Sequence, residues 1–214
     1  MAVIAAASLV SCGGSGDKKD GGDKKDSTAN KTTENKTPAG AKYAMKSGII
    51  DLKSTMMGME QKITMYFDEF GKKEASVLTM EMMGMKTETR TIKKDGYSYD
   101  IDMTKKECKK KKLPGAGDPN DLNFKDMSAD MMKKMSIKKE ANETFLGKDC
   151  EKYVMDYKEM KMKGTYLVWN AIPLKTDVDM GGIKMVMEAT KIQENASVPA
   201  DKFEVPAGFK TIEK

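Results

Sequence analysis

Methionine is the residue type whose number and spacing stand out in this sequence, because 21 of its 214 residues are methionine. Alternate residues of a β-strand point to the same face, so methionines two positions apart predict a strand with thioethers on one face and charged side chains on the other. A surface of flexible, polarisable thioethers suits apolar ligands of irregular shape, such as acyl chains. The clearest alternating pairs are Met80 and Met82, Met160 and Met162, and Met185 and Met187.

Two other interpretations of the methionines remain open. Methionine can replace leucine and isoleucine in an ordinary packed core. Thioethers also bind soft metal ions such as copper(I) and silver(I), and the runs Met56–Met59 and Met80–Met85 each contain several sulfur atoms. The absence of histidine and the spread of methionine over the whole chain count against a dedicated metal centre, so no metal site is assigned.

Histidine, the side chain that ordinarily titrates near neutral pH, does not occur in the sequence. Its absence excludes catalytic triads with an imidazole base and metal centres with histidine ligands. The sequence also contains no nucleophile elbow and no glycine-rich phosphate loop. We therefore predict that the protein is not an enzyme, and we assign no catalytic residue and no cofactor.

The charged residues argue against nucleic acid as a partner. The net charge of +5 is a small excess of 38 basic over 33 acidic residues, and Arg90 is the only arginine. Nucleic-acid-binding surfaces usually cluster basic residues with aromatic ones. The composition instead indicates a soluble, heavily charged surface.

Cys12 follows a short apolar segment, Ala2–Val10. A membrane-spanning helix needs about 20 apolar residues, whereas the apolar region of a signal peptide needs only about 7–15. The tetrapeptide Leu9-Val10-Ser11-Cys12 resembles a bacterial lipobox, although the usual basic residues before the apolar run are missing. The resemblance implies that residues 1–11 are the remnant of a signal peptide and that Cys12 is the lipid-attachment site. It further implies a cell-envelope protein anchored to the outer membrane, on its periplasmic or surface face.

Residues 12–41 predict a disordered tether. Alanine is the only apolar residue from Gly13 to Gly40, and the motif Asp17–Asp20 recurs as Asp23–Asp26. Such a segment cannot bury enough surface to offset the entropy lost on ordering it. We expect the folded domain to cover residues 42–214.

Cys108 and Cys150 are the two remaining cysteines. In an oxidising, exported setting a disulfide between them is the first expectation, and two unrelated thiols are the alternative. The lysines at positions 109–112 are interpreted as part of a solvated loop.

Hydrophobic alternation predicts many β-strands from Tyr43 onward. Turn residues separate the alternating segments, and the Asp95-Gly96 pair in particular predicts a tight hairpin. Strands at short, regular spacing favour an antiparallel meander. The alternating series are Ile63-Met65-Phe67, Leu78-Met80-Met82, Tyr97-Tyr99-Ile101-Met103, Tyr153-Met155-Tyr157, Tyr166-Val168 and Ile183-Met185-Met187.

The segment between Pro119 and Ile137 has helical spacing instead. Its apolar residues include Leu122, Met131 and Met135, and Ser128 is a candidate helix cap. We therefore predict an α+β fold in which one or more helices pack on the concave face of a strongly curved antiparallel sheet.

Motifs in the carboxy-terminal third resemble exported proteins grouped with the LolA/LolB-like superfamily. The resemblance extends over about residues 43–212 and implies an incompletely closed, curved antiparallel barrel with helices filling its concavity. Its better-known members hold lipid acyl chains. The motifs are Gly147–Tyr153, Tyr166–Trp169 followed by Ile172–Lys175, and Val198–Phe209.

These observations predict a cell-envelope lipoprotein that binds a lipid or another hydrophobic ligand in a methionine-lined concavity, without catalysis. The alternative is a structural or protein-interaction lipoprotein with a filled core and an unknown protein partner. The candidate ligand-contacting residues are Met80, Met82, Met160, Met162, Met185, Met187 and Trp169.

Overall fold

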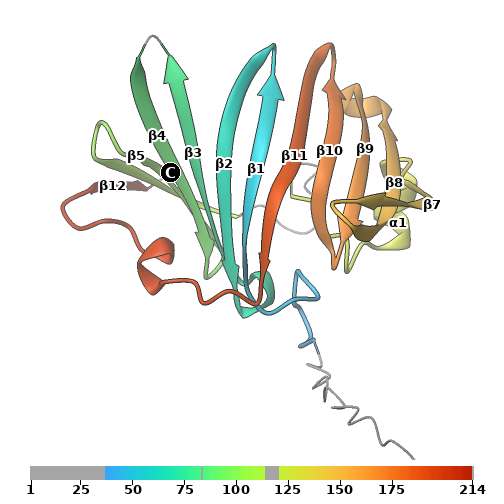
Figure 1. Cartoon of the computed structure of the whole chain (residues 1–214), viewed down its shortest axis with the longest axis horizontal. Coiled ribbons are helices and arrows are strands. Elements are labelled where there is room, and N and C mark those ends of the chain that lie inside the picture. The colour runs from blue at the N-terminus through green and yellow to red at the C-terminus, as the bar shows by residue number, and fades with distance from the viewer. Residues whose placement is uncertain (1–36, 83, 114–120, 214) are drawn as a thin grey trace, which may run out of the picture. The chain divides into compact units, whose positions relative to one another are not determined.

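The computed structural model describes residues 37–82, 84–113 and 121–213, which all belong to one compact unit (Figure 1). The predicted signal peptide, Cys12 and most of the predicted tether lie outside the described residues. Within the described part, twelve strands form a single sheet. The same part contains one α-helix, α1 (Ala129–Lys134), and none of its helices is long and apolar enough to cross a membrane.

Six of the twelve strands, β2, β3, β5, β8, β9 and β11, lie on the alternating segments predicted from the sequence. Three short 3-10 turns, η1 (Glu69–Gly71), η2 (Lys158–Met160) and η3 (Ala200–Phe203), connect or flank them. The strands are β1 (Gly48–Met56), β2 (Met59–Asp68), β3 (Lys73–Met82), β4 (Met85–Lys94), β5 (Tyr97–Asp102), β6 (Glu107–Lys112), β7 (Lys138–Phe145), β8 (Lys148–Tyr157), β9 (Met162–Trp169), β10 (Ile172–Met180), β11 (Ile183–Glu194) and β12 (Lys210–Glu213).

Two meanders make up the sheet, whose strand order is β12-β6-β5-β4-β3-β2-β1-β11-β10-β9-β8-β7. The predicted antiparallel meander is therefore confirmed within each half. The halves join where β1 pairs with β11, which places Gly48 opposite Glu194. β12 is the exception to the antiparallel pattern, because it pairs with β6 in parallel.

The hairpin predicted at Asp95-Gly96 is confirmed. Asp95 and Gly96 have φ angles of 52° and 77° and connect β4 to β5. Positive φ at both central residues is what a two-residue hairpin needs to match the twist of its strands. Met57 and Gly58 have similar angles, 52° and 78°, and connect β1 to β2.

The predicted α+β class is wrong, because the described part is mostly β with one short helix and an open twelve-stranded sheet. A helix does begin after Ser128, whose Oγ accepts a hydrogen bond from the backbone N–H of Met131. It ends after six residues, since Ser136 takes a left-handed conformation with φ of 49° and β7 begins at Lys138. Residues 121–128 before the helix form turns and irregular structure, so helical spacing of apolar residues misled the prediction.

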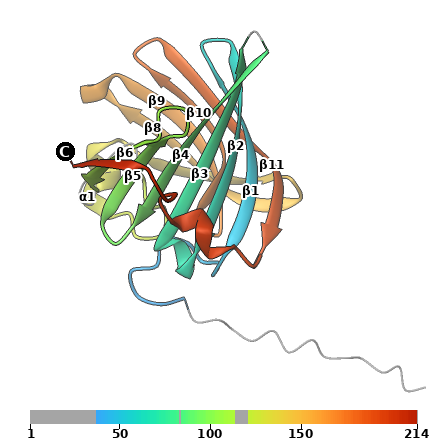
Figure 2. The same cartoon turned by 90° about the vertical axis from the view of Figure 1, so that its left-hand side faces the viewer.

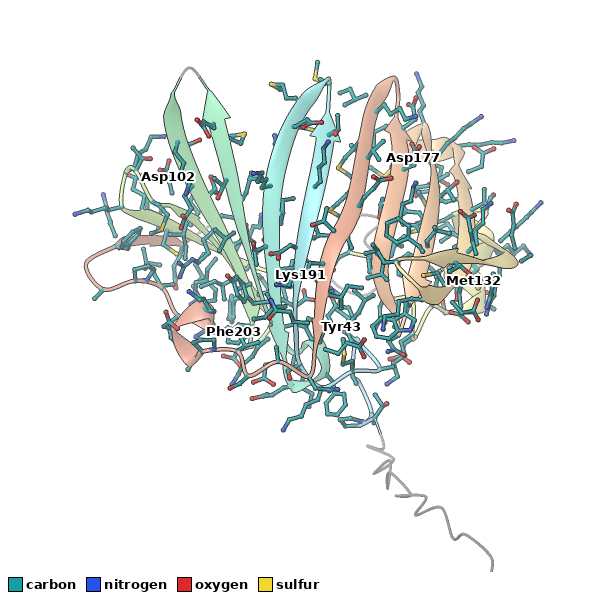
Figure 3. The ribbon with its side chains drawn as sticks, viewed as in Figure 1. Tyr43, Asp102, Met132, Asp177, Lys191 and Phe203 are labelled. Atoms are coloured by element: carbon teal, nitrogen blue, oxygen red, sulfur yellow. The ribbon has the colours of Figure 1, made fainter. Side chains whose placement is uncertain are left out.

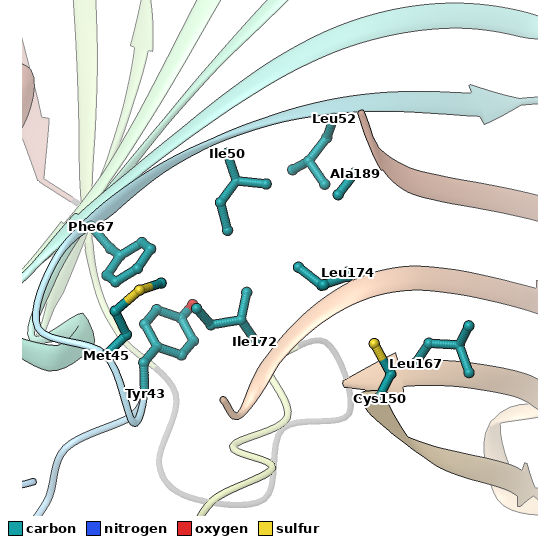
Figure 4. Close-up of a cluster of buried hydrophobic side chains, with 10 residues drawn as sticks. All are labelled: Tyr43, Met45, Ile50, Leu52, Phe67, Cys150, Leu167, Ile172, Leu174 and Ala189. Atoms are coloured by element: carbon teal, nitrogen blue, oxygen red, sulfur yellow. The ribbon is translucent and has the colours of Figure 1, made fainter. Parts of the chain in front are cut away.

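The inner face of the sheet, defined as the face that carries Ile50, Leu52 and Phe67, holds the larger part of the core. Figure 4 shows the sheet bending so that Ile50 of β1 and Leu174 of β10 point toward each other. Both side chains are completely buried. The bend of the sheet thus brings its own strands into contact on the inner side.

On β3–β6 the buried apolar side chains, Ala75, Ile92, Ile101 and Cys108, lie on the opposite, outer face. Phe67 pairs with Glu74, so the inner face becomes polar there, whereas the next residue, Ala75, pairs with Ile92 on the outer face. Phe203 of η3 covers this outer cluster, which Figure 2 shows with the carboxy-terminal segment in front of the sheet. One sheet therefore carries two cores on opposite faces.

The lysines at 109–112 were predicted to lie in a loop, and this prediction is wrong. They form most of strand β6. Alternation explains how it fits a sheet: Lys110 lies 2.9 Å from Glu213 of β12, and Lys111 lies 2.8 Å from Asp100 of β5. Charged side chains of this kind suit a strand near the edge of a sheet.

Candidate functional site

A pocket of about 190 Å³ lies against the inner face of β9–β11. Side chains from the sheet form one wall, and residues from the segments before β1 and before α1 form the other. The lining residues are Lys42, Tyr43, Asp121, Leu122, Phe124, Met162, Tyr166, Pro173, Thr176, Val178, Met180, Met185 and Met187.

Strand register explains why four methionines meet at this pocket. Met162 of β9 pairs directly with Met180 of β10. Met185 of β11 pairs with Val178, and Met187 pairs with Thr176. Directly opposite side chains on antiparallel strands have Cβ atoms about 4.5–5.5 Å apart, so these thioethers line one continuous patch.

Phe124, from the segment before α1, covers the pocket and packs against two tyrosines of the sheet, Tyr153 of β8 and Tyr166 of β9. The Phe124 ring lies 5.2 Å from the Tyr153 ring and 5.3 Å from the Tyr166 ring, between centroids. Asn123 shapes the turn that presents Phe124, because its Oδ1 accepts hydrogen bonds from the backbone N–H groups of Lys125 and Asp126. Burial raises the pKa of Tyr166 to about 12, so its phenol is neutral at neutral pH. The wall formed by Tyr166 is therefore uncharged.

A cluster of charged side chains, which we call the polar cluster, closes one end of the pocket. Lys42 Nζ lies 2.7 Å from Asp121 and 3.1 Å from Glu74. The hydroxyl of Tyr43 donates a hydrogen bond to Glu74, and Lys93 Nζ lies 3.2 Å from Asp121. Tyr43 sits at the end of the sheet where β1 begins (Figure 3).

The charges of the polar cluster stabilise one another. Burial lowers the pKa of Lys42, but the carboxylates of Glu74 and Asp121 outweigh this effect and raise it above its ordinary value. Burial raises the pKa of Asp121, but Lys42 and Lys93 outweigh that effect and lower it. Burial, followed by the charge of Glu74, raises the pKa of Tyr43 well above its ordinary value. The cluster is thus internally paired and fixes the pocket's end.

The structure brings together three of the predicted ligand-contacting residues, Met162, Met185 and Met187, at this pocket. Met80 is half-buried on β3 and does not line it. Met160 lies on η2 with 52% of its surface exposed. The side chain of Met82 lies outside the described part of the structure.

Trp169 is not part of the pocket lining either. It ends β9 opposite Ile172, and Lys148 Nζ lies 4.5 Å from the centroid of its ring. Its half-buried ring packs against the inner core cluster, so the motif around Trp169 is explained by packing.

The predicted disulfide is not formed. Cys108 and Cys150 are both free and completely buried, and they belong to different core clusters. Strands β5, β4, β3, β2, β1, β11, β10 and β9 lie between β6 and β8 in the sheet, which carry the two cysteines. Burial raises the pKa of both thiols, which makes them less reactive. The alternative of two unrelated thiols is the one that holds.

Sequence reasoning missed the residues that close the pocket. Lys42 reaches Glu74 and Asp121, which are 32 and 79 residues away along the chain. No local pattern links such distant residues. Phe124 and Met180 were detectable as apolar residues next to turns, but their position at the pocket depends on the tertiary fold.

No family model matches this sequence, and no curated protein matches it. The structure, in contrast, is similar to several solved structures. An uncharacterised conserved protein from Thermus thermophilus has a TM-score of 0.55 at 8% identity, with 79% of this chain and 91% of the other covered. MucB has a TM-score of 0.52 at 10% identity, with 79% of this chain and 61% of MucB covered.

A weaker likeness is to a Vibrio parahaemolyticus domain described as an outer membrane lipoprotein-sorting protein. Its TM-score is 0.35 at 11% identity, with 74% of this chain and 89% of the other covered. We draw no conclusion from a TM-score this low. At these identities the comparisons establish a shared fold alone. The open antiparallel sheet of this structure matches what the LolA/LolB-like resemblance implied, while membership of a lipoprotein family stays a prediction.

Proposed function

We propose that this protein is a non-catalytic component of the bacterial cell envelope that binds a lipid or another apolar ligand in the pocket on the inner face of β9–β11. The observation that carries the proposal is the pocket lining, which combines the thioethers of Met162, Met180, Met185 and Met187 with the rings of Phe124 and Tyr166. Thioethers adapt to irregular apolar shapes, and the neutral Tyr166 adds no charge. The envelope location rests on the lipobox resemblance at Cys12.

The pocket size restricts the ligand. Apolar cavities of about 150 Å³ hold a benzene-sized molecule, whereas pockets that enclose whole drug-sized ligands span about 300–1,000 Å³. A pocket of about 190 Å³ therefore accommodates a short apolar segment, such as part of one acyl chain. A larger lipid would leave its remaining atoms outside the pocket.

The chain-length dependence of binding tests this proposal. We expect the full chain with Cys12→Ser to bind straight-chain fatty acids, measured by calorimetry. Each buried methylene contributes about 0.8 kcal/mol, roughly a fourfold change in Kd, until the pocket is full. Equal affinity for short and long chains, or no binding of any of them, would contradict the proposal.

A pocket-filling variant with a matched control locates the site. Met185→Trp places a bulky ring in the pocket and is expected to abolish binding. Met160→Trp makes the same change on the exposed turn η2 and is expected to leave the affinity unchanged. If both variants bind like the unaltered chain, the ligand lies elsewhere or the inner face is only a filled core, as in a structural or protein-interaction lipoprotein.

A further inference from the structure

Three methionines from three neighbouring strands lie in one row at the end of the inner face. Met56 of β1 pairs directly with Met59 of β2 on one side and with Met185 of β11 on the other. We propose that the thioethers of Met56, Met59 and Met185 form a binding site for a soft monovalent cation, copper(I) or silver(I). Met185 also lines the pocket, but Met56 and Met59 do not, so the inference does not depend on the pocket holding an apolar ligand.

Strand geometry lets the three sulfur atoms converge. Directly opposite residues of antiparallel strands have Cβ atoms about 4.5–5.5 Å apart, so Met59 and Met185 flank Met56 closely. Methionine is unbranched with three rotatable side-chain bonds, so the two outer sulfur atoms can lean toward the central one. The row lies at the upper end of β1, β2 and β11 in Figure 1.

Burial at the row suits a metal ion that must enter from solvent. Met59 has 47% of its surface exposed, while Met56 and Met185 are half-buried. The inner sulfur atoms are therefore shielded, and the outermost residue leaves an access path. A site with this gradient excludes part of the water around the ion without closing the route to it.

Neighbouring charges do not compete for the row. The next inner-face residues along β1, β2 and β11 are Ser54, Gln61 and Met187, which are all neutral. Lys53 and Lys184 alternate to the outer face, where they pair with Glu60 and Asp177. Among these described inner-face neighbours on β1, β2 and β11 there is thus no cation to repel a metal ion and no carboxylate to favour a hard cation such as Ca²⁺ or Mg²⁺.

The ligand set selects the class of metal. Among the described residues, no group of three histidine, cysteine, aspartate or glutamate side chains could hold a metal ion. Soft thioethers select soft ions such as copper(I) over harder divalent ions. A neutral thioether has no proton to lose, so binding should not depend on pH between 5 and 8, unlike binding at histidine or cysteine ligands.

Nuclear magnetic resonance of ¹³C-labelled methionine methyl groups tests the site directly. The probe is silver(I), titrated into the full chain with Cys12→Ser, Cys108→Ala and Cys150→Ala, so that no thiol competes. We expect the methyl signals of Met56, Met59 and Met185 to shift first and to saturate at one equivalent. The exposed Met57 and Met160 serve as internal references, with 72% and 52% of their surfaces exposed. If they shift at the same silver concentration as the row, binding follows exposure alone and the proposal is overturned.

Two triple variants provide a second test that does not depend on assigned signals. Met56→Leu, Met59→Leu and Met185→Leu together should abolish saturable silver(I) and copper(I) binding. Met57→Leu, Met132→Leu and Met160→Leu remove the same number of sulfur atoms and should leave it intact. Circular dichroism checks that both variants are folded. Retained binding in the first variant, or equal loss in both, would overturn the site.

Discussion

Lys42 Nζ and Asp121 Oδ1 lie 2.7 Å apart, although 79 residues separate them in the sequence. This ion pair joins the segment before β1 to the segment before α1 at the closed end of the pocket. Glu74 of β3 also contacts Lys42, so the sheet and both covering segments meet at one ammonium group. The pocket's shape therefore depends on a few charges that no single element supplies.

The stability of the protein should fall in acid as Asp121 becomes protonated. The pKa of this carboxyl is lowered in the folded state from its reference value of 3.8, so its stabilising effect is fully present above pH 3.8 and is lost as the pH falls through the folded pKa. Urea unfolding between pH 6 and pH 2 should show this loss, and Asp121→Asn should reduce it. An unchanged pH profile in Asp121→Asn would contradict the assignment.

Replacing Lys42 alone should destabilise the fold more than replacing Lys42 and Asp121 together. Lys42→Met leaves Glu74 and Asp121 without their shared cation, and we expect a loss of about 2 kcal/mol, typical of hydrogen bonds to charged groups. The double variant Lys42→Met with Asp121→Asn should recover part of this loss, because one unpaired charge is gone. Additive effects in a double-mutant cycle would argue against direct coupling.

Phe124 should contribute strongly to stability as the ring between Tyr153 and Tyr166. Phe124→Ala removes a nearly buried ring, and we expect a loss of about 3 kcal/mol. The pKa of Tyr166 should also fall from about 12, because water would reach its phenol. Ultraviolet titration measures the second effect. The control is Phe209→Ala. Phe209 is half-buried against the outer core cluster, so this change should leave the titration of Tyr166 unchanged.

The two cysteines of the folded part should remain thiols after export. The chain with Cys12→Ser should yield two reactive thiols in denaturant and almost none when folded, because Cys108 and Cys150 are completely buried. Thiol-labelling followed by mass spectrometry measures both numbers. If the protein purified without a reducing agent is lighter than the reduced protein by two hydrogen atoms, the disulfide does form.

Phe203 should protect the outer core and the thiol inside it. Phe203 has 4% of its surface exposed and packs in the same cluster as Cys108 and Ile92. Phe203→Ala should cost about 3 kcal/mol and should speed the labelling of Cys108 but not of Cys150. Equal acceleration at both cysteines would indicate global unfolding instead of a local opening.

Cys12 should be acylated in cells. Metabolic labelling with an alkyne fatty acid should mark the unaltered chain and should fail with Cys12→Ser, which should also leave the membrane fraction. Ser11→Ala is the control, since it keeps a small residue before the cysteine and should be labelled normally. Absence of label on the unaltered chain would remove the support for envelope anchoring.

Alternation of apolar and polar residues located six of the twelve strands, and turn residues located the hairpin at Asp95-Gly96. Both are local: the side chains of a strand alternate with a period of two, and a tight hairpin needs residues that tolerate positive φ. The same reasoning failed for residues 119–137, where Ser128 caps a helix of only six residues. Apolar residues at helical spacing are compatible with a helix, but tertiary contacts decide how long the helix is.

The sequence by itself determined that this protein is built from many antiparallel strands with thioethers on alternate positions, because backbone geometry imposes that alternation wherever a strand forms. Only the tertiary structure decided which face of the sheet is buried in each half, since that depends on what covers it. The inner face around Ile50 packs against the opposite side of the bend, and the outer face around Ile92 packs under Phe203. For the same reason Cys108 and Cys150 lie apart, and Met162 and Met187 share a pocket while Met160 faces solvent.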